Sequence, residues 1–104
     1  MSDALKTQIR NELRATYATV TVDDAREPPR DGWPVMRREL GEPDLVVWLP
    51  SGVRCYLEVA GSLSEVQQLF GIMCRRLQCA YAIVRNADEA KEAIRFWSLS
   101  GRVA

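Results

Sequence analysis

Two acidic residues, Asp44 and Glu58, stand near the open end of a predicted β-hairpin. The intervening segment 49–52 (LPSG) suits a type I turn, and Gly52 can take the positive φ that completes a three-residue hairpin loop. This loop sets a register in which Asp44 lies opposite Glu58. Like charges on neighbouring strands are unfavourable unless a cation lies between them. The pair therefore indicates a site for a divalent ion with hard oxygen ligands.

Side chains along the predicted hairpin alternate between two faces that differ in polarity. One face is uncharged and is expected to lie in the core, whereas the other presents both acids. A simpler alternative is that Asp44 is a turn residue after Pro43 and that Glu58 is a solvated charge at a strand end. The uncharged face comprises Leu45, Val47, Leu49, Val53, Cys55, Leu57 and Val59, and the opposite face comprises Asp44, Val46, Trp48, Arg54, Tyr56, Glu58 and Ala60.

Three short motifs around the acidic pair follow one another in a specific order. Together they resemble the VRR-NUC branch of the PD-(D/E)xK nuclease superfamily, which includes the nuclease domain of the Fanconi-associated nuclease and stand-alone phage and bacterial proteins. The resemblance covers roughly residues 41 to 96. The motifs are Pro43-Asp44, then Glu58-Val59-Ala60-Gly61, then Leu63-Ser64-Glu65-Val66-Gln67.

The resemblance implies a metal-dependent, structure-selective endonuclease that hydrolyses phosphodiesters in branched DNA, such as Holliday junctions, and acts as a homodimer. It implies that Asp44, Glu58 and the main-chain carbonyl of Val59 bind Mg²⁺ or Mn²⁺ through oxygen atoms. It also implies that Gln67 points toward the active site. Gln67 has a structural role as well, because Ser64 and Gln67 form a capping-box sequence.

In this branch the first helix usually contributes a further acid to the metal site. Glu12 is the candidate here, with Asp3 as the second choice, although the usual position falls nearer Ala4. The alternative is that Glu12 is a surface partner for Lys6 or Arg10.

The chain departs from the family pattern at Ala60, where the branch has a lysine. In the family that ammonium group is thought to orient or help deprotonate the attacking water and to offset charge on the phosphate. A methyl group can do neither. The sequence therefore predicts a catalytically disabled enzyme, either by a deliberate change or as a natural member that binds without cutting.

The composition is that of one ordinary globular domain, residues 1–104, with 47% hydrophobic and 27% charged residues. The formal net charge of zero argues against a protein that simply coats nucleic acid. With no histidine, and with three cysteines that share no ligand spacing, a zinc site and histidine-dependent catalysis are not expected. The odd number of cysteines predicts a cytoplasmic protein, and the resemblance suggests that it is bacterial or phage-encoded. No apolar run is long enough to predict a membrane segment.

The predicted elements alternate in a way that is typical of an α/β fold. Their order, α-β-β-β-α-β-α, and the parallel pair around the second helix predict a central mixed β-sheet flanked by helices, a restriction-endonuclease-like sandwich. Helices are expected over 3–17, 64–77 and 86–97, and strands over 19–22, in both arms of the hairpin and over 78–84, with a loop over 23–34 and a further strand over 35–40.

Arginine supplies 12 of the 14 basic residues, which suits a phosphodiester partner because its planar fork binds phosphate through two hydrogen bonds. A GC-rich genome is an equally simple explanation, and the loop over 23–34 is otherwise a solvated one. Two further functions stay open: a non-catalytic nucleic-acid-binding or assembly module that keeps the nuclease fold, and a small interaction domain with no nucleic acid. The candidates for DNA contact are Arg26, Arg30, Arg37, Arg38 and Arg54.

Overall fold

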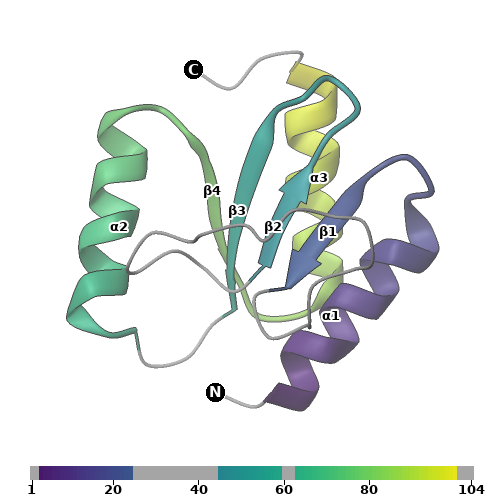
Figure 1. The fold of residues 1–104 in the computed structure, drawn as a ribbon, viewed down its shortest axis with the longest axis horizontal. Helices are drawn as coiled ribbons and strands as arrows, with labels where there is room; N and C mark the ends of the chain where they lie inside the picture. Colours follow the sequence, from purple (N-terminus) through teal and green to yellow (C-terminus); the bar gives the residue numbers. More distant parts are fainter. Residues whose placement is uncertain (1–2, 25–44, 60–62, 101–104) are drawn as a thin grey trace, which may run out of the picture.

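The chain has an α/β fold in which three helices surround a four-stranded mixed sheet in the part that the structure describes. That structure, a computed structural model, describes residues 3–24, 45–59 and 63–100 (Figure 1). The predicted order of elements is confirmed. The elements are α1 (Asp3–Thr16), β1 (Thr21–Asp24), β2 (Leu45–Trp48), β3 (Arg54–Val59), α2 (Glu65–Arg76), β4 (Ala80–Val84) and α3 (Ala87–Ser100).

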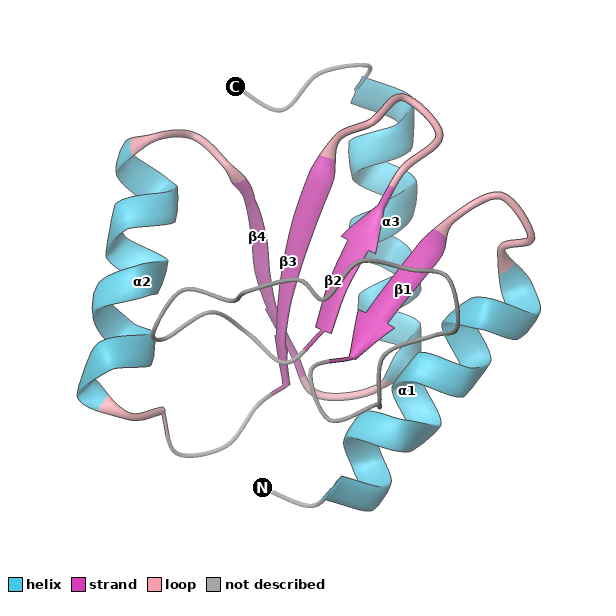
Figure 2. Ribbon diagram, viewed as in Figure 1, coloured by secondary structure: helices cyan, strands magenta, loops and turns pink. Residues whose placement is uncertain are grey.

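The four strands lie in the order β1-β2-β3-β4. The pairs β1–β2 and β2–β3 are antiparallel, whereas β3 and β4 are parallel, as expected for strands joined through a helix. Figure 2 shows this sheet between α2 on one side and α3 on the other.

The hairpin between β2 and β3 has the predicted loop and register. The Leu49 amide donates to the Val53 carbonyl at 3.0 Å, which closes a three-residue loop, and Gly52 has a φ of +89°. Leu45 pairs with Leu57 and Trp48 with Arg54. The predicted pairing is thus confirmed as far as Leu45, the residue that follows Asp44, whereas Asp44 itself lies outside the described residues.

The uncharged face of the hairpin lies in the core, as predicted. Leu45, Val47, Cys55 and Leu57 are fully buried and pack with the apolar residues of α1 and α3 in one cluster. Burial raises the pKa of the Cys55 thiol to about 12, so this side chain acts as an apolar core residue at neutral pH. The opposite face of the sheet is covered in part by α2, which contacts β4 (Figure 1).

Two strand boundaries differ from the prediction, each for a local reason. The first strand lies two residues later than expected and includes Asp23 and Asp24, which had been placed in the loop. Aspartate disfavours strands, but Asp24 pairs here with Arg10 of α1, so a contact distant in sequence stabilises it. The strand β4 begins at Ala80 because Gln78 takes a φ of +56° directly after α2.

The helices agree closely with their predicted ranges. Ile9 and Leu13 of α1 are fully buried. The Glu89 amide donates to the Asn86 side chain, which thereby caps the beginning of α3. This helix continues three residues beyond the predicted end, because no glycine or proline interrupts it before Gly101. The predicted strand over 35–40 and most of the predicted loop lie outside the described residues.

Candidate functional site

Glu58 is a buried carboxylate on β3, where its neighbours in sequence, Leu57 and Val59, are buried apolar residues. It stands next to the last residue of β3, and its side chain projects toward the sheet face that α2 covers, opposite to that of Leu57. Only 3% of its surface is exposed. Burying a carboxylate costs several kcal/mol unless polar partners or a metal ion surround it, so this position calls for a specific environment.

Gln67 supplies one part of that environment while it also caps α2. The Ser64 amide donates to Gln67 Oε1 at 2.9 Å, and the Gln67 amide donates to Ser64 Oγ at 3.2 Å, which completes the capping box. The same side chain donates from Nε2 to Glu58 Oε1 at 3.3 Å. The capping box thereby orients the amide toward Glu58, so the two roles predicted for Gln67 coexist in one conformation.

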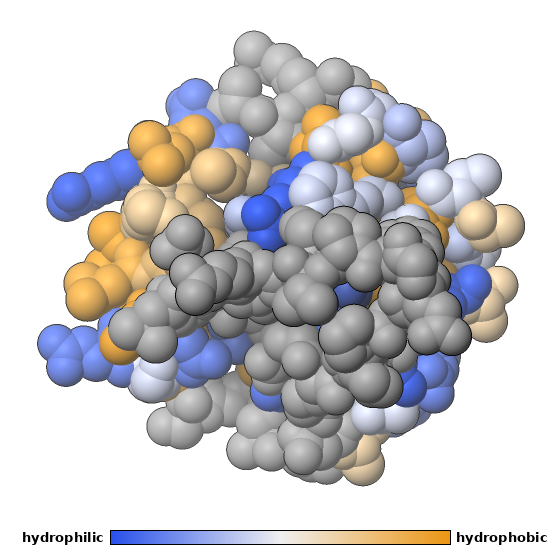
Figure 3. Space-filling model, in the orientation of Figure 1, coloured by the Kyte–Doolittle hydropathy of each residue, from blue (hydrophilic) through white to orange (hydrophobic). Residues whose placement is uncertain are grey.

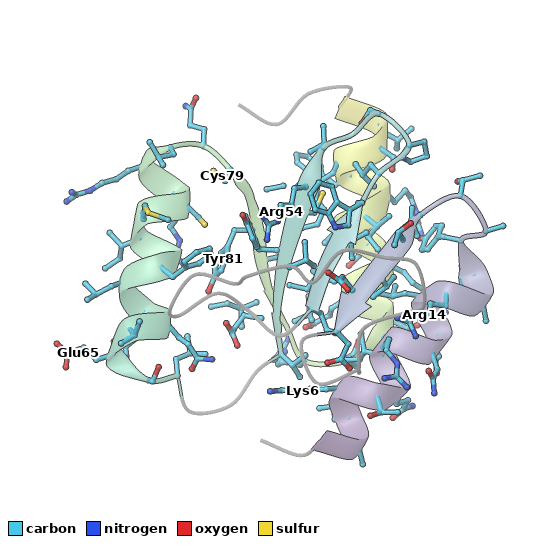
Figure 4. All side chains as sticks on the ribbon, viewed as in Figure 1. Lys6, Arg14, Arg54, Glu65, Cys79 and Tyr81 are labelled. Carbon is cyan, nitrogen blue, oxygen red and sulfur yellow. The ribbon has the colours of Figure 1, made fainter. Side chains whose placement is uncertain are left out.

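Tyr81 of β4 lies between the sheet and α2 (Figure 4), on the sheet face of Glu58. Burial and the negative charge of Glu58 raise the pKa of its hydroxyl, against an opposing effect of Arg75. The hydroxyl therefore stays protonated at neutral pH and is available as a donor. A Cβ atom at position 71 would lie only 3.0 Å from this oxygen, so Gly71 permits α2 to approach the site closely.

Arg54 lies between two aromatic rings on the same sheet face. Its guanidinium carbon is 5.2 Å from the centre of the Trp48 ring and 5.1 Å from that of Tyr56. Tyr56 in turn makes an edge contact with Phe70 of α2, with 5.1 Å between the ring centres. The two cation–π contacts hold the guanidinium against this face of the sheet.

Glu12 lies in a different place from the one the metal-site hypothesis requires. Its Oε2 atom is 3.4 Å from Lys91 Nζ of α3, on the layer that covers the sheet face opposite to Glu58. Neither of the neighbours proposed from the sequence, Lys6 or Arg10, is the partner in this ion pair. The structure therefore does not bring Glu12 and Glu58 together, because the first helix packs against the third.

Among the remaining predicted site residues, Val59 and the backbone of Asp3 belong to the part of the chain that the structure describes. The side chain of Val59 is buried in the core next to Val84. Asp3 begins α1, but its side chain falls outside the description. The candidates that lie wholly outside the described residues are Arg26, Arg30, Arg37, Arg38, Asp44 and Ala60.

Asp24 is a second buried carboxylate, which the sequence analysis missed. Its side chain is fully buried, and its Oδ2 atom is 3.3 Å from Nη1 of Arg10. The local sequence gives no signal for this contact, because Arg10 precedes Asp24 by 14 residues. Asp23, by contrast, pairs with Val46 and so projects to the sheet face of Glu58.

Across the described parts of the chain, no three side chains of the types that usually bind metals gather into one cluster. Glu58 is thus a buried carboxylate in that part, and the predicted second carboxylate, Asp44, lies outside the described residues. None of the three described helices has the length and apolar character needed to cross a bilayer. Comparison with protein-family models, with characterised proteins and with solved structures finds no match to this chain.

Replacing Gln67 by glutamate tests the contact with Glu58 separately from helix capping. Glutamate also completes a capping box, but it exchanges the donor beside Glu58 for a second negative charge. We expect Gln67→Glu to lower the free energy of unfolding by about 1–2 kcal/mol near pH 7.5. Repulsion raises the pKa of one carboxyl of this pair in the folded state, so the penalty shrinks as the pH falls toward about 5.

Urea unfolding at both pH values measures this effect. The control is Gln68→Glu, which adds the same charge one residue later at an exposed position and also removes a surface hydrogen bond from the Gln68 side chain to the Leu63 carbonyl. Equal stability of the two variants at both pH values would show that the amide of Gln67 does not hold Glu58.

Proposed function

We propose that this protein is a metal-dependent, structure-selective DNA endonuclease of the VRR-NUC type, with a restriction-endonuclease-like fold, and that Ala60 impairs its reaction. The observation that carries the proposal is the contact between Glu58 and Gln67. A buried carboxylate at the end of the hairpin is held by a glutamine from the helix that follows, and both residues belong to the motifs that resemble that branch. A purely structural sheet face has no need for a buried acid at this point.

The chemistry of the donor atoms near Glu58 fits Mg²⁺ or Mn²⁺. The groups at this site are a carboxylate, an amide and a tyrosine hydroxyl, whereas Cys55 faces the other side of the sheet and the chain has no histidine. Hard oxygen ligands favour these ions over zinc. In this proposal Glu58, Asp44 and the main-chain carbonyl of Val59 hold the ion. When bound, the ion lowers the pKa of a water molecule and offsets charge on the phosphate.

The other residues have distinct tasks in the proposed site. Gln67 fixes the orientation of Glu58, because its own conformation is set by the capping box. In this proposal Arg54, which two aromatic rings hold on the sheet face of Glu58, contacts a DNA phosphate. Ala60 offers no proton and no positive charge at the position where the family has lysine, so the step that activates water is weak.

Calorimetric titration with MnCl₂ tests the metal site without relying on cleavage. We expect the unmodified protein to bind Mn²⁺ and both Asp44→Asn and Glu58→Gln to weaken that binding by about tenfold or more, because each removes a charged oxygen ligand. Asp88→Asn, which removes a carboxylate from the first turn of α3, is the control and should leave binding unchanged. Equal binding by all four proteins would remove the metal site from the proposal.

A second candidate function follows from Ala60. If Ala60 marks a chain that has exchanged catalysis for binding, the protein is a non-catalytic DNA-binding or assembly module with the nuclease fold. Such a module binds branched DNA with an affinity that falls as the salt concentration rises, and it gains no activity when lysine is introduced at position 60.

A further inference from the structure

The turn between α2 and β4 brings two cysteines close together in its backbone. The Cys79 amide donates to the Cys74 carbonyl at 2.9 Å, and the Gln78 amide donates to the Arg75 carbonyl at 3.3 Å. Gln78 takes a φ of +56°. These two hydrogen bonds around a left-handed residue define a Schellman motif. With Leu77 as the C-cap, Cys74 lies three positions before the cap and Cys79 two positions after it.

The side chains at these two positions of a Schellman motif commonly contact each other. Here they also lie on the same side of the sheet. Cys74 is on the inward side of α2, together with Phe70 and Gly71. Cys79 comes two residues before Tyr81, whose side chain lies between the sheet and α2, and side chains two residues apart in an extended chain share a face. The turn therefore places the two thiols next to each other.

The two thiols differ in their access to solvent. Cys74 is 1% exposed, whereas Cys79 is exposed in the turn, where Figure 4 labels it. A small oxidant therefore meets Cys79 first, and Cys74 is within reach only of a neighbouring group of the protein. The third cysteine, Cys55, is buried in the core on the other face of the sheet, so it takes no part in this pair.

Positive charge surrounds the exposed thiol. Arg75 and Arg76 stand between the two cysteines in the sequence, and both are exposed. Figure 3 shows hydrophilic surface at this end of α2, and the guanidinium carbon of Arg75 is 5.8 Å from the centre of the Tyr81 ring. Such charges raise the local concentration of an anionic reagent. Oxidised glutathione, a small disulfide with a net negative charge at neutral pH, belongs to this class.

We propose that Cys74 and Cys79 form a site of reversible oxidation, at which an anionic small-molecule disulfide converts the two thiols into one intramolecular disulfide. The Cys79 thiolate attacks a sulfur of oxidised glutathione, which forms a mixed disulfide and releases one glutathione thiolate. The Cys74 thiolate then attacks the Cys79 sulfur and displaces the second glutathione. The two glutathione thiolates take up the two protons that the cysteines lose, so two cysteines are oxidised and one glutathione disulfide is reduced.

The new bond ties the last turn of α2 to the start of β4. It joins positions that the backbone hydrogen bonds of the turn already hold together, and it restricts the unfolded chain. We therefore expect oxidation to raise the Tm by roughly 5–10 °C and reduction to reverse the change. In reducing surroundings both cysteines are thiols, which is their state in this structure. The proposal does not depend on the metal site.

Peptide mapping of the unmodified protein tests the pairing directly. The reduced, folded protein is incubated with oxidised glutathione, its remaining thiols are blocked with iodoacetamide, and it is digested with trypsin and glutamyl endopeptidase. Cleavage after Arg75 and Arg76 separates the two cysteines onto different peptides. We expect peptides 66–75 and 77–85 to remain linked until dithiothreitol is added, and Cys55 to be found alkylated.

Two variants test the order of the steps and the role of the turn. Cys74→Ser lacks the second nucleophile, so it should accumulate the mixed disulfide of Cys79 with glutathione. The matched control is Gln78→Cys combined with Cys79→Ser, which moves the exposed thiol by one residue and out of the position that faces Cys74. This control should form the intramolecular bond at least tenfold more slowly. Circular dichroism checks that both variants are folded.

Four results would overturn the proposal. The first is a mixed disulfide with glutathione that persists at Cys79 in the unmodified protein. The second is a disulfide that forms only between two chains or that includes Cys55. The third is an equally fast reaction of the control with the moved cysteine, which would mean that the turn does not position the pair. The fourth is a fall in Tm on oxidation, which would show that the native turn does not fit a disulfide. The first two results come from the unmodified protein, so they do not depend on the folding of any variant.

Discussion

Introducing lysine at position 60 is expected to raise the rate of cleavage of branched DNA by roughly 10²–10⁴. The proposed site contains the carboxylates for a metal ion but lacks a group that can assist proton removal from the attacking water. Ala60→Lys supplies an ammonium group next to the strand that carries Glu58. The effect is on the chemical step, so we expect DNA affinity to change much less than the single-turnover rate.

Single-turnover cleavage of a labelled four-way junction, with Mg²⁺ or Mn²⁺ present, measures this gain. Ala60→Met is the matched control, because it adds a side chain of similar length without the charge, and it should remain inactive. Combining Ala60→Lys with Glu58→Gln should abolish the new activity. If Ala60→Lys is folded, binds Mn²⁺ and still does not cut, then the missing lysine is not what prevents catalysis, and the binding-module alternative gains support.

The hairpin shows how far local sequence can define a candidate site. A three-residue loop with glycine at a position of positive φ predicted one register for the two arms, and the structure has that register. The capping box of α2 was equally local, since Ser64 and Gln67 are three residues apart. Both features depend on neighbours within a few residues, which is why they were predictable.

The features that were missed all depend on contacts between distant segments. Glu12 was assigned to the metal site or to a neighbour on its own helix, but it pairs with Lys91, which is 79 residues further along the chain. Asp24 was placed in a loop because the stabilising contact from Arg10 cannot be seen in the local pattern. Sequence periodicity predicts which side of a helix is apolar, but it does not indicate which element covers that side.

The apolar side chains of α2 illustrate the same point. Their helical spacing predicts the helix correctly, yet only Phe70 is buried in the core among the five residues that show this spacing, Val66, Leu69, Phe70, Met73 and Leu77. Leu69 and Met73 lie outside the core. The helix packs closely against Tyr81 through Gly71, so these larger residues do not face the sheet. The sequence alone therefore does not distinguish the side of α2 that packs on the sheet from the apolar side that remains exposed. The packing of the helix must be known first.

Truncation of Leu57 is expected to be among the most destabilising single changes in the chain. Leu57 is fully buried on β3, the strand that pairs with β2 on one side and β4 on the other. Leu57→Ala removes buried methyl groups and leaves a cavity in the cluster under α1 and α3, which typically costs about 3 kcal/mol. For a domain of this size that loss corresponds to a fall in Tm of roughly 12–20 °C.

Thermal and urea unfolding at low protein concentration measure this effect without a contribution from self-association. Leu99→Ala is the matched control: the same atoms are removed from a side chain that is 80% exposed, so we expect a change below about 0.5 kcal/mol.

Because Glu58 directly follows Leu57, measuring Mn²⁺ binding by Leu57→Ala also separates the stability of the core from the function of the proposed site. A variant that loses about 3 kcal/mol but keeps Mn²⁺ binding below its Tm would show that the site geometry survives while the core is weakened. A small effect of Leu57→Ala would mean that the face assigned to the core is not closely packed around β3, and the orientation of Glu58 toward α2 would then be wrong as well.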